Sequence, residues 1–326
     1  MFNRRSFIAA ALGGALLLTQ GGAMAQTSWP ERPVRFIVPF APGGGVDIAA
    51  RLIGEHLQKH WQQPVIIENR PGANTLIAAQ AVQSAAKDGY TLLITNAPTF
   101  YLPAVNPSVT LRPLEEFVPI AELTVDQLVV IAPASLKANT LNDVLELAKK
   151  DPKSFAYGSY GYGTVAHLLL HEINTTRGLD LVHIPYRGTA PLIQAMLAGD
   201  VNLGVTNYGT AKPFIESGKL QPLAVMGTPR SPFMPDVPTL SEEGVTRFET
   251  YQWVGVFAPA GVPNELIQKI SKDIQTVIHS EPVTKRLADF FTRPGTKHTD
   301  EFRALVERDA KVQGGMSQAA GIRMGD

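Results

Sequence analysis

The sequence predicts an α/β protein of two lobes, each a mainly parallel sheet flanked by helices. Short apolar runs alternate with helical patterns along most of the chain, as is typical of parallel sheets. A glycine-rich turn follows a buried strand twice, at residues 43–45 and 158–163, which indicates two similar units. The chain of 326 residues also exceeds the roughly 100–200 residues of one domain. We therefore expect two domains.

The first unit begins with a buried strand over residues 34–40 and the first glycine-rich turn. A helical pattern over 47–58 follows, because Ile48, Leu52, Ile53 and Leu57 lie on one face. The other elements expected here are a strand at 65–68, a turn at 69–72, a helix at 75–86 and a strand at 89–94.

The second unit repeats the alternation of strands and helices. Its expected strands are 128–131, 155–159, 181–185, 201–206 and 223–226, and its expected helices are 141–150, 164–176 and 189–198. A strand at 253–258 and two helices at 264–280 and 299–314 close the chain. We find neither a low-complexity linker nor a short repeat in the sequence.

The first 25 residues have the pattern of an export signal. Arg4 and Arg5 precede an apolar run over residues 7–18, and Ala23-Met24-Ala25 is a small-x-small cleavage site. The apolar run is shorter than the roughly 20 residues that a membrane-spanning helix needs. We expect cleavage after Ala25 and a periplasmic protein, exported by either the Sec or the twin-arginine route.

Composition excludes several classes of function. The sequence has no cysteine, which excludes thiol catalysis, disulfides and cysteine metal sites. The 29 Lys and Arg residues balance 29 Asp and Glu residues. No basic stripe is available for a phosphate backbone, so we expect no nucleic-acid partner.

The first glycine-rich turn could hold an anion. Its glycines let a ligand approach the backbone, and the next helix points free N–H groups at the turn. A tight connection without a ligand explains the glycines equally well. Asp47 stands where a helix cap or first-turn acid belongs. A dinucleotide fingerprint is absent, because Ile48 stands where glycine or alanine is required.

The second glycine-rich turn has a serine at its centre. A nucleophile elbow requires glycine two residues before the serine, and Tyr157 stands there. Ser159 is therefore expected to donate a hydrogen bond rather than to attack a substrate. Gly163 and Thr164 would form a second helix start that suits an anion.

Two histidine pairs have the spacing of metal ligands. His56 and His60 are four residues apart, as are His167 and His171. Leu57 stands where a zinc protease needs glutamate, and no third ligand is evident. Packed or solvated histidines are favoured, with His167 expected near the cleft.

Aromatic residues gather at strand ends and in loops, where they could line an apolar pocket or simply pack. They are Phe40, Phe100, Tyr101, Tyr160, Tyr162, Tyr186 and Tyr208. Arg187 follows Tyr186, and its planar guanidinium could clamp a carboxylate. A surface ion pair is the other interpretation of Arg187.

Seven motifs stand in a specific order along the chain. They are PFAPGGGVDIAAR (39–51), ENRPGA (68–73), DGYTLL (88–93), FVPIA (117–121), YGSYGYGTVAHL (157–168), PYRGTAP (185–191) and WVGVFAPAGVP (253–263). With the export signal, this set resembles the tripartite tricarboxylate transporter substrate-binding family, also called the Bug family. The resemblance covers the whole mature chain.

The resemblance implies a type II periplasmic binding protein fold, in which hinge strands join two lobes that close on a ligand. The lobes would be residues 26–126 with 250–326, and residues 127–249. Loops at 40–45 and 158–164 would hold one carboxylate group of the ligand. The implied partners are a small carboxylate ligand and the small and large membrane subunits of an ion-driven transporter. We expect a monomer without cofactor, metal or catalytic activity.

The sequence departs from the family pattern in three places. Residues 74–76 replace the usual glycine-rich stretch, residues 96–101 add two aromatic rings, and residues 207–208 add another. We therefore expect an aromatic acid, such as terephthalate or phthalate, ahead of di- and tricarboxylates. The expected ligand-binding residues are Phe40, Ala41, Gly43, Gly44, Asn96, Phe100, Tyr101, Ser159, Gly163, Thr164, His167, Arg187, Asn207 and Tyr208.

Two other functions stay open. A receptor that senses a ligand for a membrane kinase would use the same fold and site. A secreted hydrolase would use Ser159, or a metal at His56 and His60, although the missing motifs argue against it.

Overall fold

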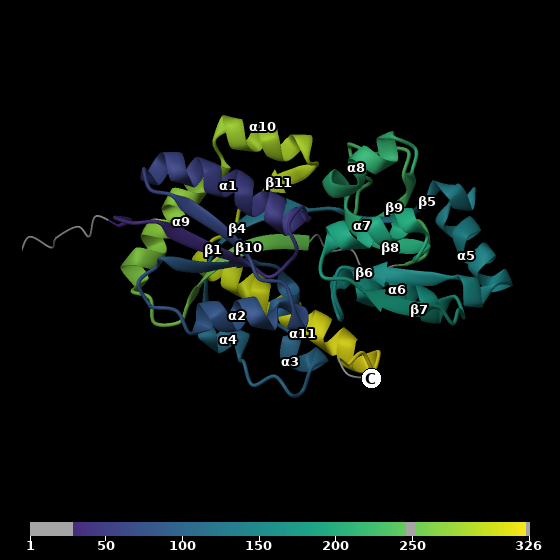
Figure 1. Cartoon of the computed structure of the whole chain (residues 1–326), viewed down its shortest axis with the longest axis horizontal. Coiled ribbons are helices and arrows are strands. Elements are labelled where there is room, and N and C mark those ends of the chain that lie inside the picture. The colour runs from purple at the N-terminus through teal and green to yellow at the C-terminus, as the bar shows by residue number, and fades with distance from the viewer. Residues whose placement is uncertain (1–28, 246–251, 324–326) are drawn as a thin grey trace, which may run out of the picture. The chain divides into compact units, whose positions relative to one another are not determined.

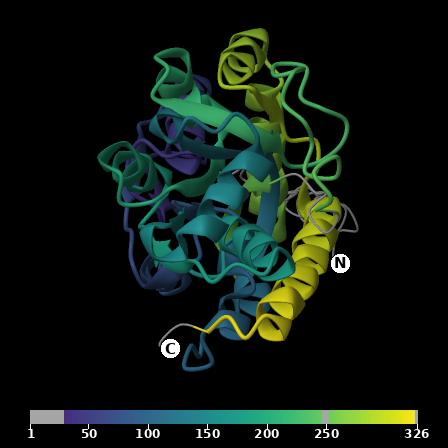
Figure 2. The ribbon, with the colours of Figure 1, turned by 90° about the vertical axis from the view of Figure 1, so that its right-hand side faces the viewer.

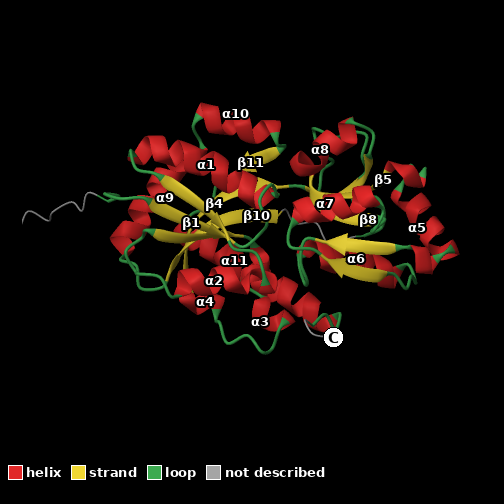
Figure 3. Cartoon of the chain, viewed as in Figure 1, coloured by secondary structure: helices red, strands yellow, loops and turns green. Residues whose placement is uncertain are grey.

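The computed structural model describes residues 29–245 and 252–323. The predicted signal peptide and the predicted lobe boundary at 249/250 lie outside these residues. From Arg32 onward the described chain forms two β-sheets with helices packed against them (Figures 1 and 3). In the part of the chain that the model describes, no helix is long and apolar enough to cross a membrane.

The first sheet has six strands in the order β11-β4-β10-β3-β1-β2. Its strands are β1 (Val34–Val38), β2 (Val65–Asn69), β3 (Thr91–Thr95), β4 (Phe117–Asp126), β10 (Gln252–Pro259) and β11 (Thr292–Pro294). Strand β1 is parallel to β2 and β3, whereas β10 is antiparallel to β3 and β4.

Helices cover both faces of the first sheet (Figure 1). On one face lie α1 (Gly45–Trp61), α9 (Asn264–Ile278) and α10 (Glu281–Asp289). On the other lie α2 (Leu76–Gln83), the short helices α3 (Leu102–Val105) and α4 (Pro113–Glu116), and α11 (Thr299–Ala319). Figure 2 shows α11 as the long yellow helix, and the Trp253 indole N–H donates to Asp309 of this helix over 2.8 Å.

The second sheet has five strands in the order β7-β6-β8-β5-β9. They are β5 (Leu128–Pro133), β6 (Ala156–Ser159), β7 (Val182–Pro185), β8 (Leu203–Asn207) and β9 (Leu220–Val225). The helices of this lobe are α5 (Leu141–Lys150), α6 (Val165–Thr176), α7 (Thr189–Ala198) and α8 (Tyr208–Glu216).

The predicted two-lobed α/β fold is confirmed, but both sheets are mixed. Strands that follow a crossover helix are parallel, as in β1-α1-β2 and β6-α6-β7. A single residue, Gln127, separates the end of β4 from the start of β5. Such a short connection carries the chain from one sheet to the other, and β5 enters its sheet antiparallel to β8 and β9.

The sequence pattern did not predict several helices and strands. Helices α5 and α7 have the expected bounds, but α8 and α10 were not expected at all. Helix α8 contains Pro213, and α10 opens on Glu281 and Pro282, which obscure the apolar period. Strand β4 contains Pro119, a residue that normally argues against a strand.

Candidate ligand site

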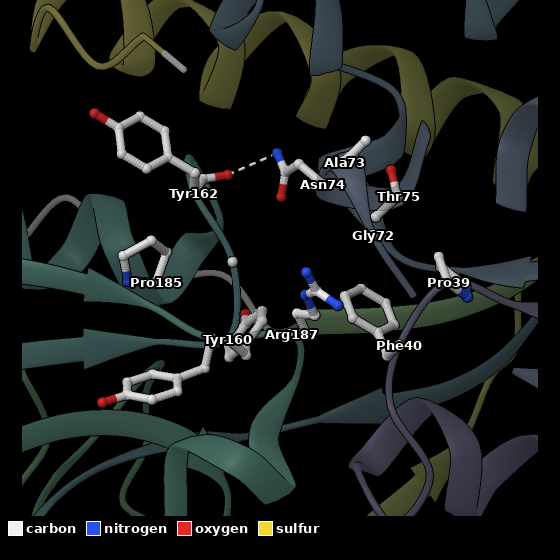
Figure 4. A pocket seen from close by; sticks show the side chains of 12 residues that line it. Pro39, Phe40, Gly72, Ala73, Asn74, Thr75, Tyr160, Tyr162, Pro185 and Arg187 are labelled. Atoms are coloured by element: carbon white, nitrogen blue, oxygen red, sulfur yellow. Dashed lines mark hydrogen bonds between the residues drawn. The ribbon is translucent and has the colours of Figure 1, made fainter. Parts of the chain in front are cut away.

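A cavity of about 250 Å³ lies between segments of the two lobes (Figure 4). It is lined by Pro39, Phe40, Gly72, Ala73, Asn74, Thr75, Tyr160, Gly161, Tyr162, Pro185, Tyr186 and Arg187. Three of the four lining segments follow the carboxyl ends of parallel strands β1, β6 and β7. Ligands of open α/β sheets bind at this edge, where the strands leave a crevice.

Arg187 carries the one formal charge among the lining residues of this cavity. Figure 4 shows Arg187 and Phe40 among the residues that line the cavity. The Arg187 carbonyl accepts a hydrogen bond from the Ala41 amide over 3.1 Å, which ties the Arg187 backbone to the first lobe. Among the described residues, Arg187 has no carboxylate partner. The predicted surface ion pair is therefore not formed here, and the charge is available to an anion.

The segment 72–75 closes one side of the cavity in an uncommon backbone conformation. Ala73, Asn74 and Thr75 have positive φ angles of 44°, 50° and 79°. Each such residue costs about 1–2 kcal/mol, so tertiary contacts must hold the segment. One contact is visible in Figure 4, where the Asn74 side-chain amide donates to the Tyr162 carbonyl over 2.7 Å. This bond joins the two lobes at the cavity.

The first glycine-rich turn is organised around Asp47, in the first turn of α1. The Asp47 carboxylate accepts hydrogen bonds from the Gly43 amide (2.8 Å), Asn69 (2.8 Å) and Arg51 (3.0 Å). Burial alone would raise the pKa of Asp47, but these hydrogen bonds hold it below its ordinary value. Gly43 has a φ of 83°, which favours glycine. The Gly43 amide is thus engaged within the lobe.

The second glycine-rich turn also satisfies its own donors. The fully buried Ser159 hydroxyl lies 2.8 Å from the Gly161 carbonyl and 2.7 Å from His183 Nε2. The Thr164 hydroxyl donates to the same carbonyl over 2.7 Å. The Gly163 amide donates to His167 Nδ1 over 2.9 Å. A ligand that bound these groups directly would have to replace these bonds.

Two histidines stack behind this turn. The rings of His167 and His183 lie 3.6 Å apart at an angle of 11°. Burial, with added repulsion from His183 and His171, lowers the pKa of His167 to about 2. Burial and His171 lower the pKa of His183 to about 4. Both rings are therefore neutral at neutral pH.

The histidines do not assemble a recognisable metal or catalytic centre. No group of three or more His, Asp or Glu side chains in the described ranges could hold a metal ion. Ser159 and His183 are in hydrogen-bond contact, but His183 Nδ1 is buried without a partner. A serine nucleophile needs a histidine that a third group orients.

The structure places the expected ligand-binding residues at the cavity, beside it, in the two glycine-rich turns and in packed aromatic clusters. Phe40 and Arg187 line the cavity. Gly44, Asn96 and Asn207 line, with Phe40, a second space of about 10 Å³ beside it. The turn residues Ala41, Gly43, Ser159, Gly163, Thr164 and His167 have the internal hydrogen bonds given above, and the ligand-contacting role of all these residues stays a prediction.

Three expected aromatic contacts lie away from the cavity. Phe100 packs in the first lobe against Phe257, with ring centroids 4.5 Å apart, and is 4% exposed. Tyr101 is 3% exposed in the same core. Tyr208 packs against Phe291, with centroids 4.4 Å apart. Apolar burial holds these rings in place, since each finds an aromatic or aliphatic neighbour.

The sequence reasoning missed segment 72–75 as a cavity wall. The departure from the family pattern at Asn74 and Thr75 is the signal in the sequence that marks this segment. The left-handed backbone and the bond to Tyr162 depend on the second lobe, so local pattern could not reveal them.

Comparisons with known proteins agree with the fold described above. Residues 49–322 match the family model described as "Tripartite tricarboxylate transporter family receptor". The chain is 32% identical to the UPF0065 protein in the gbd 5′ region of Cupriavidus necator, over 98% of each chain. It is 30% identical to the protein BugT of Bordetella pertussis, over 95% of this chain and 97% of BugT.

Solved structures are similar over most of the chain. The periplasmic binding protein BugD superposes with a TM-score of 0.85 at 29% identity, covering 90% of this chain and 99% of BugD. An R. palustris protein solved with adipate gives a TM-score of 0.86 at 30% identity, and the match covers 90% of this chain and 99% of that protein. MatC from Rhodopseudomonas palustris, solved with bound malate, gives a TM-score of 0.83 at 28% identity, and the match covers 88% of this chain and 99% of MatC.

Proposed function

The chain belongs to the family of tripartite tricarboxylate transporter receptors, and from this we propose that it captures a small carboxylate in the cavity beside Arg187. This family consists of solute-binding receptors. The observation that carries the proposal is Arg187, the one cation among the described residues that line a cavity between two lobes. A guanidinium matches the planar geometry of a carboxylate and forms paired hydrogen bonds with it.

The cavity suits a ligand with an apolar or aromatic body. Its volume of about 250 Å³ is just below the roughly 300–1,000 Å³ of pockets for drug-sized molecules, so the ligand is small. Phe40, Tyr160, Tyr162 and Tyr186 line the space with two prolines, whereas Asn74 and Thr75 supply few polar groups. Rings offset or edge-on to these side chains would add to the binding energy. We therefore prefer an aromatic acid such as terephthalate or phthalate.

Linear dicarboxylates are the second ligand class. Adipate and malate occupy two similar receptors. Both acids are smaller or more flexible than a phthalate, and one carboxylate of either could meet Arg187 in the same way. Citrate fits less well, because Arg187 is the one cation lining the cavity and would leave two carboxylates unpaired.

The proposal includes a cellular setting. Cleavage after Ala25 by a signal peptidase would release the mature protein into the periplasm, through the Sec or the twin-arginine route. Lobes of residues 26–126 with 250–326, and 127–249, would close on the acid. A monomeric receptor would then deliver it to a small and a large membrane subunit of a tripartite transporter.

Isothermal titration calorimetry with the mature protein from Gln26 onward tests this function. The panel is terephthalate, phthalate, benzoate, adipate, malate and citrate. We expect terephthalate or phthalate to bind most tightly, and Arg187→Gln to weaken binding by about 10- to 100-fold, as the loss of a charged hydrogen bond does. Arg187→Lys keeps the charge, and its affinity should lie between those of the wild type and Arg187→Gln.

Arg112→Gln is the matched control, because Arg112 is exposed and pairs with Glu115 outside the cavity. Tight binding of malate or citrate without a response to the aromatic acids would reject the aromatic preference. Failure of every acid to bind would reject the carboxylate function itself.

A further inference from the structure

The stacked pair His167 and His183 contacts the cavity-lining turn without lining the cavity. His183 comes from β7 and reaches the start of the turn at Ser159. His167 comes from the first turn of α6 and reaches the end of the turn at Gly163. The intervening residues Tyr160, Gly161 and Tyr162 line the cavity. The two rings thus hold both ends of the segment that a ligand would touch.

The hydrogen bonds of Ser159 define the tautomer of His183. Ser159 has one hydroxyl proton, and the Gly161 carbonyl, which can only accept, lies 2.8 Å away. The His183 Nε2–H must then donate to the Ser159 oxygen. This assignment leaves His183 Nδ1, which is buried without a partner, as a bare acceptor. The opposite tautomer would bury an unpaired N–H, which costs more free energy.

The contact of His167 with Gly163 defines the tautomer of His167. The Gly163 amide can only donate, so His167 Nδ1 must be unprotonated and its ring neutral with the proton on Nε2. A proton on Nδ1 would face the amide N–H and remove the bond. His167 therefore holds the turn only as a neutral Nε2–H ring, and His183 holds it through its Nε2–H.

The turn has to keep this shape for the lobes to meet. Gly163 has a φ of 66°, and a Cβ there would lie 2.6 Å from Val105 Cγ2 in the first lobe. The Tyr162 carbonyl accepts the hydrogen bond from Asn74. A displaced turn would therefore lose contacts with the first lobe, and it would also alter the cavity.

We propose that His167 and His183 are positioning residues that hold the turn 159–164 in its ligand-lining shape. The inference rests on the proposed function for its consequence, which is that carboxylate affinity depends on two side chains outside the cavity. The titratable groups that face the pair are Tyr157 and Tyr162, with ring centroids 5.0 Å and 5.5 Å from His183, and His171, 6.2 Å from His167. None of these three is an acid that would stabilise a protonated ring.

Paired substitutions separate positioning from packing. His167→Asn keeps an acceptor at the place of Nδ1, and His183→Gln keeps a donor at the place of Nε2. His167→Leu and His183→Leu keep apolar bulk but remove the hydrogen bond. His56→Asn on α1 serves as a control, because His56 lies in the first lobe away from this turn.

The measurements are terephthalate affinity by calorimetry and amide hydrogen exchange of Gly163 without ligand. We expect each leucine variant to lower the affinity by about tenfold or more, the scale of one lost buried hydrogen bond. His167→Leu should also speed Gly163 exchange by about tenfold, whereas His167→Asn and His183→Gln should stay close to the wild type in both measurements. Imidazole ¹⁵N spectra of the wild type should show both rings as Nε2–H tautomers at neutral pH.

Unchanged affinity and Gly163 exchange in the leucine variants would overturn the proposal, as would a proton on Nδ1 of His167 or an unprotonated Nε2 on His183. The proposal would also be rejected if His167→Asn and His183→Gln lost as much affinity as the leucine variants while keeping the wild-type circular dichroism. Wild-type protein that binds no terephthalate would count against the aromatic preference alone. The exchange and tautomer results would then still decide the role of the histidines.

Discussion

At the scale of single residues, polar groups of the two glycine-rich turns are paired within the protein. The Ala41 amide bonds to the Arg187 carbonyl, the Gly43 amide to Asp47 and the Gly163 amide to His167. These bonds shape the cavity wall and leave Arg187 as its charged group. The turns thus position the site, and the recognition of an acid falls to Arg187 and the rings around it.

The buried His167 and the partly buried His183 make stability depend on pH. The pKa of His183 is about 4 because of burial and His171, against an ordinary value of about 6.5 in the unfolded chain. Between these values the unfolded state binds the proton and the folded state does not. Stability is therefore complete above about pH 6.5 and falls as the pH drops, by about 1.4 kcal/mol per pH unit from this residue.

Urea unfolding at pH 7, 6 and 5 measures this dependence. We expect His183→Gln to show a shallower loss of unfolding free energy than the wild type over that range. Parallel slopes for the two proteins would mean that His183 is protonated equally in the folded and unfolded states.

At the scale of elements, the segment 72–75 stores backbone strain beside the cavity. Ala73 is exposed and has a φ of 44°. We expect Ala73→Gly to raise the free energy of unfolding by about 1 kcal/mol, because glycine adopts this conformation without a Cβ penalty. Denaturant titration would measure the change.

Ala81→Gly, inside α2, is the matched comparison. The same substitution there should lower stability by about 1 kcal/mol. Destabilisation of similar size at both positions would show that Ala73 is not strained.

The sequence predicted the elements whose periodicity is local and missed those that depend on the other lobe. Helices α5 and α7 followed from apolar spacing, and the positions of Phe40 and Arg187 at strand ends followed from the parallel strands. Phe100 also stands after a strand, but only the packed core shows that it faces inward. The stacking of His167 on His183 joins a helix to a strand edge, which no short-range pattern encodes.

At the scale of the whole receptor, a second set of contacts joins the lobes outside the cavity. Phe291, between α10 and β11, packs edge-on against Tyr208 and Phe233, with centroids 4.4 Å and 4.5 Å apart. Lys212 lies 4.8 Å above the Phe291 ring. Within the first lobe, the Thr292 hydroxyl next to Phe291 donates to Asp126, at the end of β4, over 2.7 Å. We therefore expect closure of the lobes to depend on this aromatic cluster as well as on the ligand.

We expect Phe291→Ala to lower the free energy of unfolding by about 1–3 kcal/mol, because two aromatic pairs are lost. Small-angle X-ray scattering without ligand should show a larger radius of gyration than in the wild type. Val312→Ala, at a side chain 53% exposed on α11, is the control and should change neither value. Wild-type stability and size in Phe291→Ala would exclude a role of this cluster in closure.

The proposed function depends most directly on which molecule occupies the cavity beside Arg187. Native mass spectrometry of the protein purified without denaturation, followed by identification of the released small molecule, tests this directly. We predict a one-to-one complex with a small carboxylic acid that carries a ring, and its loss in Arg187→Gln. A bound molecule without a carboxylate, or one that Arg187→Gln retains fully, would contradict the account.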